Sequence, residues 1–309
     1  MFLELILVTF GLCLLYFGGE LLVRGAVDIG ERMGLSTLVI GLTLVAFGTS
    51  APELAVSLDA ALTDHPDIAI ANILGSNLAN LGLVAGITAI VGRVVLDRDL
   101  ATKDLPVMLT AMLLLTWLLN DASLSRTEGI LLTTALVIYV SYRVMQGKRL
   151  VSTQFKSHPN PADTNLTTPA ARILVGLLLL GFGGDLLVDN AAHLAGRFHV
   201  SEAFIGFSVV AIGTSLPEIA TSIAAVRLGQ GKVAIGNIIG SNIWNSLGVL
   251  GVTAMIGPLG GIDIPWHLVA AMLGISIVAF IIAISVGQLG RRWGVAFLCS
   301  YVAYIYYSI

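Results

Sequence analysis

Two heptads in this chain, GTSAPEL at residues 48–54 and GTSLPEI at residues 213–219, decide how it folds. Each places a proline and a glutamate inside a long apolar stretch. A proline removes a backbone donor and kinks a helix, and a glutamate is costly to bury away from water. Because this unfavourable combination occurs twice, we interpret the heptads as copies of one repeated unit.

The heptads belong to a longer internal repeat with an offset of 165 residues. Residues 45–60 and 210–225 are identical at 10 of 16 positions, and residues 69–84 and 234–249 at 9 of 16. No gap is needed within either pair of segments. This agreement indicates that one half of the chain is a duplicate of the other.

The composition is typical of a membrane protein. Of the 309 residues, 56% are hydrophobic and 11% are charged, whereas a soluble domain carries about 25% charged residues. The net charge of −3 does not suggest a nucleic-acid partner. Apolar runs near the ~20 residues that cross a bilayer predict ten spans, at residues 3–30, 37–62, 68–91, 104–119, 128–146, 170–197, 202–227, 232–256, 266–287 and 293–308.

The spans divide into two predicted repeats, residues 1–146 and 170–309, joined by a polar linker at 147–169. Each repeat holds five spans, and an odd number makes the two copies enter the membrane in opposite directions. We therefore predict an all-α integral membrane protein of ten transmembrane helices in two inverted-topology repeats. Broken helices would meet near the midplane, at the interface between the repeats.

Lysine and arginine predict the orientation in the cell membrane. If the N-terminus lies outside, thirteen of these residues fall at cytoplasmic span ends and two, Arg126 and Arg197, at outer ends. Cytoplasmic loops are the ones enriched in positive charge. We therefore expect both termini outside and the 147–169 linker in the cytoplasm.

Glu53 and Glu218 are the centre of the predicted site. A carboxylate at the bilayer centre costs on the order of 2.5 kcal/mol or more, so two at equivalent positions indicate a function. Pro52 and Pro217 should loosen the preceding turns and free carbonyl oxygens, which are tolerated at membrane depth only where protein, water or an ion satisfies them. A pair of protonated glutamates bonding between helices is the purely structural alternative.

Helical spacing brings further oxygens to these glutamates. Hydroxyls lie four residues before and after each glutamate, at Thr49 and Ser57 and at Thr214 and Ser222, on one helix face. In the following spans Ser76 shares a face with Asn80, and so does Ser241 with Asn245. The neighbouring Asn72, Asn77, Asn237 and Asn242 are expected to form interhelical hydrogen bonds instead.

The ligands in these segments are oxygens, without thiolate or imidazole. Such a set selects hard cations such as Ca²⁺ and Na⁺ over zinc or copper. Two glutamate charges would neutralise one Ca²⁺ or be shared among monovalent ions, so one set of ligands can serve both ions alternately. Protons are expected to compete for the glutamates at acidic pH.

The paired GTSxPE and GSNxxN segments resemble the two alpha-repeats of the sodium/calcium exchanger family, within the calcium:cation antiporter superfamily. The likeness covers nearly the whole chain, as in the short prokaryotic members. It implies Na⁺/Ca²⁺ antiport by alternating access, in which the first and sixth spans slide past the core. It also implies an ion cluster held by Glu53, Glu218, carbonyls of Thr49 and Thr214, Ser50, Ser76, Ser215, Ser241, Asn80, Asn245 and carbonyls of Ala46 and Ala211.

Several alternatives stay open. Asn245 stands where potassium-dependent relatives carry aspartate, which makes potassium co-transport less expected. A Ca²⁺/H⁺ antiporter is the main alternative, and a cation channel is a weaker one, because channels gather several equivalent pore segments. An intramembrane hydrolase would need a catalytic constellation that these segments lack. We expect no enzymatic activity, no cofactor and no obligate protein partner, only Ca²⁺, Na⁺ and the lipid bilayer.

Overall fold

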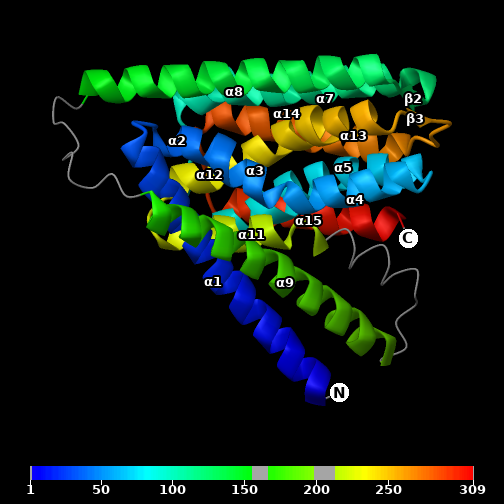
Figure 1. Cartoon of the computed structure of the whole chain (residues 1–309), viewed down its shortest axis with the longest axis horizontal. Helices are drawn as coiled ribbons and strands as arrows, with labels where there is room; N and C mark the ends of the chain where they lie inside the picture. Colours follow the sequence, from blue (N-terminus) through cyan, green and yellow to red (C-terminus); the bar gives the residue numbers. More distant parts are fainter. Residues whose placement is uncertain (1, 155–165, 198–212, 309) are drawn as a thin grey trace.

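The computed structural model describes residues 2–154, 166–197 and 213–308, and these residues are largely helical (Figure 1). Three long helices are α1 (Phe2–Arg32), α8 (Arg126–Gln154) and α9 (Thr167–Arg197). The other α-helices are α2 (Thr37–Ile40), α3 (Ala46–Thr49), α4 (Ala51–Leu62), α5 (Pro66–Ala79), α6 (Ala85–Val91), α7 (Leu105–Leu118), α11 (Leu216–Arg227), α12 (Gly231–Ile243), α13 (Leu250–Ile256), α14 (Trp266–Ser285) and α15 (Arg291–Ser308). Between them lie the π-helical segments η1 (Gly41–Val45), η2 (Asn80–Val84), η3 (Leu100–Asp104) and η5 (Trp244–Val249), and the 3₁₀ turn η4 (Leu119–Asp121).

Among these described residues, seven helical segments are long and apolar enough to cross a membrane. They match seven of the predicted spans, and they run over Leu3–Arg32, Pro66–Val91, Leu100–Asp121, Arg126–Gly147, Thr167–Leu194, Gly231–Ile256 and Trp266–Ser285. An eighth is the bent pair Thr37–Thr49 and Ala51–Leu62, whose two halves meet at 43°. The chain is therefore a multi-pass, all-helical membrane protein.

The remaining two predicted spans, at 202–227 and 293–308, stay predictions. The segment predicted at 293–308 is helical as α15, but it does not qualify as a span, because it opens on Arg291 and Arg292 and is rich in tyrosine. Only the second half of the segment predicted at 202–227 is described, as α11. The predicted number of ten spans therefore stays a prediction.

The predicted linker is shorter than expected at both ends. Helix α8 continues to Gln154, and α9 already begins at Thr167. No glycine or proline follows Gly147 until Pro159, so nothing in the sequence stops the helix at the polar boundary. The apolar span itself ends at Gly147, as polarity predicted, and the helix continues beyond it into the polar segment.

Two composite helices form the centre of the molecule. In the span built from α5, η2 and α6, 78% of the most apolar window is buried, and in that built from α12, η5 and α13, 83%. The corresponding values for the spans of α1 and α9 are 33% and 22%. The two GSNxxN segments, at 75–80 and 240–245, thus lie in the two spans with the largest buried share, which places them away from lipid.

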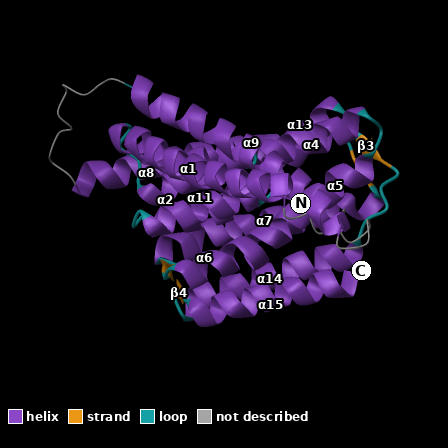
Figure 2. Ribbon diagram, turned by 90° about the horizontal axis from the view of Figure 1, so that it is seen from below, coloured by secondary structure: helices purple, strands orange, loops and turns teal. Residues whose placement is uncertain are grey.

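Two short antiparallel ladders relate the two halves of the chain. Strand β1 (Val94–Val95) pairs with β4 (Gln288–Leu289), and β2 (Ser123–Leu124) pairs with β3 (Leu259–Gly260). The pair Val94 and Leu289 corresponds, at the 165-residue offset, to Leu259 and Leu124. The two ladders lie at opposite ends of the molecule (Figures 1 and 2). Each half thus contributes one strand at either end.

Helices α1 and α9 pack closely against each other along the periphery (Figure 1). A Cβ atom added at Gly18 would lie 2.9 Å from the carbonyl oxygen of Gly176, and one at Gly176 would lie 2.8 Å from that of Gly18. Small residues let membrane helices approach closely where apolar burial no longer drives association. Glycines at this crossing therefore allow α1 and α9 to form one tightly packed pair.

A buried ion pair fixes α8 to the start of α7. The Arg143 side chain is 1% exposed, and its Nε lies 2.9 Å from Oδ1 of Asp104, which is fully buried. A second Arg143 nitrogen reaches Asp99 at 2.9 Å, and Tyr139 donates to Asp104 at 2.8 Å. Charges within a membrane domain are costly unless paired, so this cluster ties the two helices together firmly.

Candidate cation-binding site

Each heptad forms the same turn immediately before a helix. Ser50 stands between α3 and α4 with φ −81° and ψ 3°, and Ser215 precedes α11 with φ −87° and ψ 0°. Pro52 and Pro217 lie in the first turn of the helices that follow, where proline costs no hydrogen bond. The local sequence therefore produces the same backbone geometry twice.

Glu53 and Glu218 occupy the first turn of α4 and α11 and are fully buried. None of their four carboxylate oxygens has a hydrogen-bond partner among the described residues. The two carboxyl groups are close enough for their charges to interact. The positive end of each helix dipole stabilises a carboxylate there, but only partly. A buried carboxylate without a partner is costly, so each of these groups is expected to bind a cation or a proton.

Hydroxyl groups from the two halves meet beside these carboxylates. The Thr49 hydroxyl lies 3.3 Å from that of Ser241, and the Ser76 hydroxyl lies 3.2 Å from that of Thr214. The two contacts are equivalent under the 165-residue offset. Each heptad therefore contacts the GSN segment of the other half, and both halves contribute to the site.

Asparagines hold the helices of each half together around the site. Asn72 donates to the Ser57 hydroxyl at 3.0 Å, and the equivalent Asn237 donates to Ser222 at 3.2 Å. Asn237 also accepts from the Thr49 hydroxyl at 3.0 Å. These bonds confirm the expected interhelical role of Asn72 and Asn237.

The other two asparagines behave differently from each other. Asn77 donates to the Ser246 hydroxyl at 2.9 Å, as an interhelical bond, whereas Asn242 donates to the Ile238 carbonyl of its own helix at 2.7 Å. The residue equivalent to Ser246 in the first half is Leu81, which offers no acceptor. The prediction that Asn242 forms an interhelical hydrogen bond is therefore wrong.

Asn80 and Asn245 lie where the two central helices change to π-helical geometry. Asn80 begins η2 and Asn245 lies in η5, and both are fully buried. Their amide oxygens and nitrogens have no partner within the described parts of the chain. Short π-helical segments often mark functional sites because they disturb the regular hydrogen-bond ladder. The sequence contained no signal for this geometry.

The remaining predicted ligands have more varied surroundings. The hydroxyls of Ser50 and Ser215 are buried and have no partner in the described residues. The Ala46 carbonyl, expected to be partly freed, accepts the Ser50 amide at 3.0 Å and the Thr49 hydroxyl at 3.4 Å. The break comes after Thr49, so the turn that uses this carbonyl remains closed. Ala211 lies outside the described residues.

The resulting ligand set is made of oxygens. In the described ranges, no three His, Cys, Asp or Glu side chains gather as a metal-binding group. What gathers instead is two carboxylates, several hydroxyls and two amide groups, all but one of them from buried side chains. Such a set suits a hard cation such as Ca²⁺ or Na⁺, and it does not suit zinc or copper.

Comparison with known proteins agrees with this chemistry. The family profile described as "Sodium/calcium exchanger protein" matches residues 3–145 and 168–309. The chain belongs to the sodium/calcium exchanger family. The exchanger profile thus includes both halves of the chain and both helix breaks, and the stretch between the matched segments contains only the linker.

Two relatives of this exchanger are similar to it over most of their length. The chain is 39% identical to "Putative antiporter CaxA" of Alkalimonas amylolytica over 84% of this chain and 82% of that protein. It is 30% identical to "Sodium/calcium exchanger MaX1" of Methanosarcina acetivorans over 97% of each. The structure of the sodium-calcium exchanger NCX_Mj soaked with Na⁺ and Ca²⁺ superposes with a TM-score of 0.83, at 32% identity over 98% of each chain.

Proposed function

We propose that this protein is a secondary antiporter that exchanges Na⁺ for Ca²⁺ across the cell membrane. One observation carries the proposal: Glu53 and Glu218 are fully buried at equivalent positions of the two halves, and their oxygens have no hydrogen-bond partner in the described structure. Two negative charges can balance one Ca²⁺, or they can be shared by monovalent ions. Competition for the same charge is a sufficient basis for exchange.

The proposed ligands form one cluster around these carboxylates. Glu53 and Glu218 bridge a Ca²⁺ position and the Na⁺ positions beside it. The hydroxyl contacts between Thr49 and Ser241 and between Ser76 and Thr214 bring oxygens from both halves to this cluster. The full proposed set is Glu53, Glu218, Thr49, Thr214, Ser50, Ser215, Ser76, Ser241, Asn80, Asn245 and the carbonyls of Ala46 and Ala211.

We infer that the chain forms two inverted five-helix repeats, residues 1–146 and 170–309, with ten spans in all. The paired strand ladders at opposite ends of the molecule and the equivalent Thr–Ser contacts support a two-fold relation between the halves. The distribution of lysine and arginine in the sequence supports outer termini and a cytoplasmic connection at 147–169.

Alternating access is supported by one asymmetry between the halves. Helix α1 packs along α11, and a Cβ at Gly19 would lie 2.9 Å from the Ala220 carbonyl oxygen. The equivalent contact would join α9 to α4, and the described parts of those helices make no comparable contact. Among the described residues, α1 thus packs along α11, whereas α9 does not pack along α4. Exchange of these two contacts would open the site to the other face.

Transport in liposomes tests the proposal. Purified protein is reconstituted into Na⁺-loaded vesicles, and uptake of external Ca²⁺ is followed. We expect uptake to require the outward Na⁺ gradient and to be lost in Glu53→Gln and Glu218→Gln. Glu31→Gln, an exposed carboxylate at the end of α1, is the matched control and should transport normally.

Different outcomes separate the alternatives. If a proton gradient replaces the Na⁺ gradient, the protein is a Ca²⁺/H⁺ antiporter and the counter-ion assignment is wrong. If Ca²⁺ enters without any counter-ion, the protein acts as a cation channel. If both glutamine variants transport like the parent protein, the proposed site itself is wrong.

A further inference from the structure

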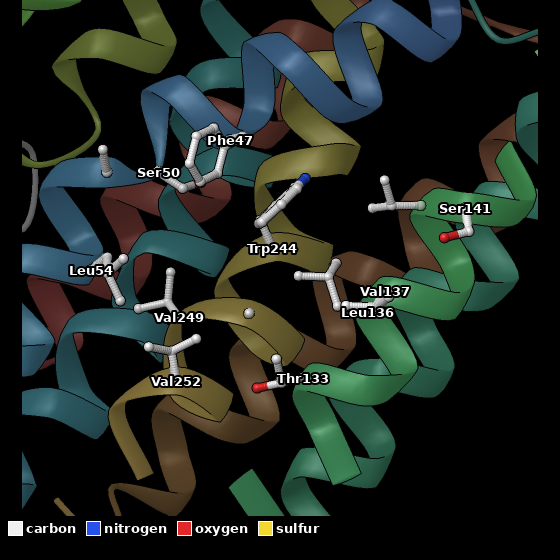
Figure 3. Close-up of a pocket in the computed structure, with 13 residues that line it drawn as sticks. Phe47, Ser50, Leu54, Thr133, Leu136, Val137, Ser141, Trp244, Val249 and Val252 are labelled. Carbon is white, nitrogen blue, oxygen red and sulfur yellow. The ribbon is translucent and has the colours of Figure 1, made fainter. Parts of the chain in front are cut away.

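A cavity of about 320 Å³ lies between α8 and the helices that carry the site (Figure 3). On the α8 side it is lined by Leu136, Val137 and Val140, which share one face of that helix. On the other side it is lined by Leu54, Trp244 and Val249. All of the α8 residues belong to the segment Arg126–Gly147, which is apolar enough to span a membrane. The cavity therefore lies at membrane depth.

Helix α8 is held at both ends of this cavity. At its first turn, a Cβ at Gly129 would lie 2.7 Å from the Gly251 carbonyl oxygen of α13, so the two backbones touch. Toward its other end, Arg143 pairs with Asp104 at 2.9 Å. Between these two points Leu136 packs on η5, where a Cβ added at Gly248 would lie 2.7 Å from the Leu136 side chain. The cavity therefore lies beside a packed contact, and Val137 lines it on the lipid-facing side of α8.

The lining is mostly apolar. Its polar side chains are Ser50, Thr133 and Ser141, and the hydroxyls of Ser50 and Thr133 have no partner among the described residues. Ser50 lies at the α3–α4 break and Thr133 on α8, so they belong to opposite walls, whereas a buried water needs two to four polar partners together. The Trp244 indole nitrogen is already used, because it donates to the Leu42 carbonyl at 3.3 Å. The side of the cavity toward the bilayer continues directly into the lipid-facing surface, where the Val137 side chain is 59% exposed and that of Phe47 is 53% exposed.

The cavity reaches the helix break of the first heptad. Ser50 and Ala51 line it, at the point where α3 and α4 meet at 43°. Phe47 and Trp244 form its wall toward a second cavity of about 300 Å³, with ring centroids 5.0 Å apart. The residue equivalent to Trp244 in the first half is Ala79. The residue equivalent to Phe47 in the second half is Ile212, so the duplication does not repeat this aromatic wall, to which each half contributes one ring.

We propose that an acyl chain of a bilayer phospholipid occupies this cavity and packs against Trp244 and the α3–α4 break. Hydrocarbon is the solvent on its open side, and an unfilled apolar space forfeits the dispersion contacts of its lining. A flexible acyl chain restores those contacts without burying a polar group. The chain would support the broken helix from the lipid side, next to the hydroxyl of Ser50. This proposal does not depend on which ions the protein exchanges.

Fluorescence quenching by brominated lipid tests the proposal. The chain has four tryptophans, and the variant with Trp117→Phe, Trp266→Phe and Trp293→Phe retains Trp244 alone. It is reconstituted in phosphatidylcholine that carries bromine in the middle of one acyl chain. We expect strong quenching of Trp244 fluorescence. Adding Val137→Phe, which fills the cavity from α8, should reduce the quenching at least twofold.

Ile138→Phe is the matched control for the cavity-filling variant. Ile138 is the next residue on α8 and is 64% exposed, but it does not line the cavity. Its replacement should leave the quenching of Trp244 unchanged. Equal quenching in all three proteins would overturn the proposal, because the bromine would then reach Trp244 only from the outer surface. Quenching by aqueous iodide in place of brominated lipid would show a water-filled cavity and would also overturn it.

A second measurement uses the chain with all four tryptophans. Native mass spectrometry after mild detergent extraction should detect one retained phospholipid with the parent protein and with Ile138→Phe, and loss of it with Val137→Phe. Retention of the lipid by all three proteins would contradict the proposal. This measurement also keeps the test decisive if the protein with a single tryptophan does not fold.

Discussion

The hydroxyl groups of Thr49 and Ser241 lie 3.3 Å apart, although 192 residues separate them in the chain. The equivalent pair, Ser76 and Thr214, lies 3.2 Å apart. These two contacts cross between the halves of the chain beside Glu53 and Glu218. Neither half therefore forms a complete site, and a substitution in either half should affect the same ions.

The first prediction concerns the stability of the protein without ions. Glu53→Gln should raise the thermal midpoint in the presence of a chelator, because it removes a buried charge without a protein partner. The same variant should lose most of the stabilisation that Ca²⁺ gives the parent protein, which at a hundredfold excess over Kd is about 2.7 kcal/mol. Differential scanning fluorimetry with and without Ca²⁺ measures both effects.

Glu31→Gln serves again as the control, and it should change neither value. A fall in the midpoint of Glu53→Gln under chelator would mean that the glutamate makes stabilising protein contacts when no ion is bound. That result would favour the purely structural role of a protonated carboxyl group bonding between helices.

The second prediction concerns the coupling between the halves. Thr49→Val and Ser241→Ala each remove one hydroxyl of a contacting pair, so their effects on Ca²⁺ affinity should not add. A double-mutant cycle should give a coupling of about 0.5–1.5 kcal/mol, the usual net value of one hydrogen bond. Thr49→Val combined with Ser76→Ala is the matched comparison within one half. Additive effects in the first cycle would contradict the shared site.

The third prediction concerns the buried ion pair of α8. Asp104→Asn leaves the buried Arg143 with Asp99 as its counter-charge, so it should destabilise the protein, but by less than the ~3–5 kcal/mol of a buried charge without any partner. Asp104→Leu combined with Arg143→Met removes both charges and should cost much less. Thermal unfolding in detergent compares the three proteins. If the double variant is as unstable as the single one, the pair contributes specific contacts beyond mutual neutralisation.

The fourth prediction concerns pH and Asp99, which precedes the span that begins at Leu100. Partial burial raises the pKa of this carboxyl, but hydrogen bonds from Lys103 and Arg143 outweigh it, and the net pKa lies below the ordinary value of 3.8. A lowered pKa contributes stability above the unfolded-state value, and this contribution is lost as the pH falls through the folded value.

Asp99→Asn should therefore lower the thermal midpoint at pH 6 and have a smaller effect at pH 3. The comparison is made between the variant and the parent protein at each pH, so that general acid destabilisation cancels. An Asp99→Asn effect of equal size at both pH values would show that the carboxylate charge does not stabilise this end of the protein.

Much of the fold could be predicted because its signals are local or repeated. Apolar length predicted seven spans that the structure describes and the bent pair that contains Glu53. Polarity predicted the end of the span near residue 147, but it did not predict that the helix continues to Gln154, where no glycine or proline stops it. The segment predicted at 293–308 is helical as α15, and its crossing of the membrane stays a prediction.

The candidate site was predictable only in part. The duplication singled out Glu53 and Glu218, and helical spacing singled out the hydroxyls around them. Spacing could not show that the Ala46 carbonyl still accepts a hydrogen bond from the Ser50 amide. A bend one residue earlier in the chain would have broken that bond. Spacing could not show the π-helical turns at Asn80 and Asn245 either, because no residue pattern distinguishes them from an ordinary helix.

The sequence by itself determined which groups are present. It contains two glutamates, each next to a proline and repeated at one offset, within a chain that has the composition of a membrane protein. Those properties follow from residue identity and from distances along a single helix. Only the tertiary structure decided that Thr49 meets Ser241 and not Ser76, that Arg143 is buried against Asp104, and that α8 leaves an apolar cavity beside Trp244. Such contacts join segments far apart in the chain, and they depend on how the helices pack, which no local pattern encodes.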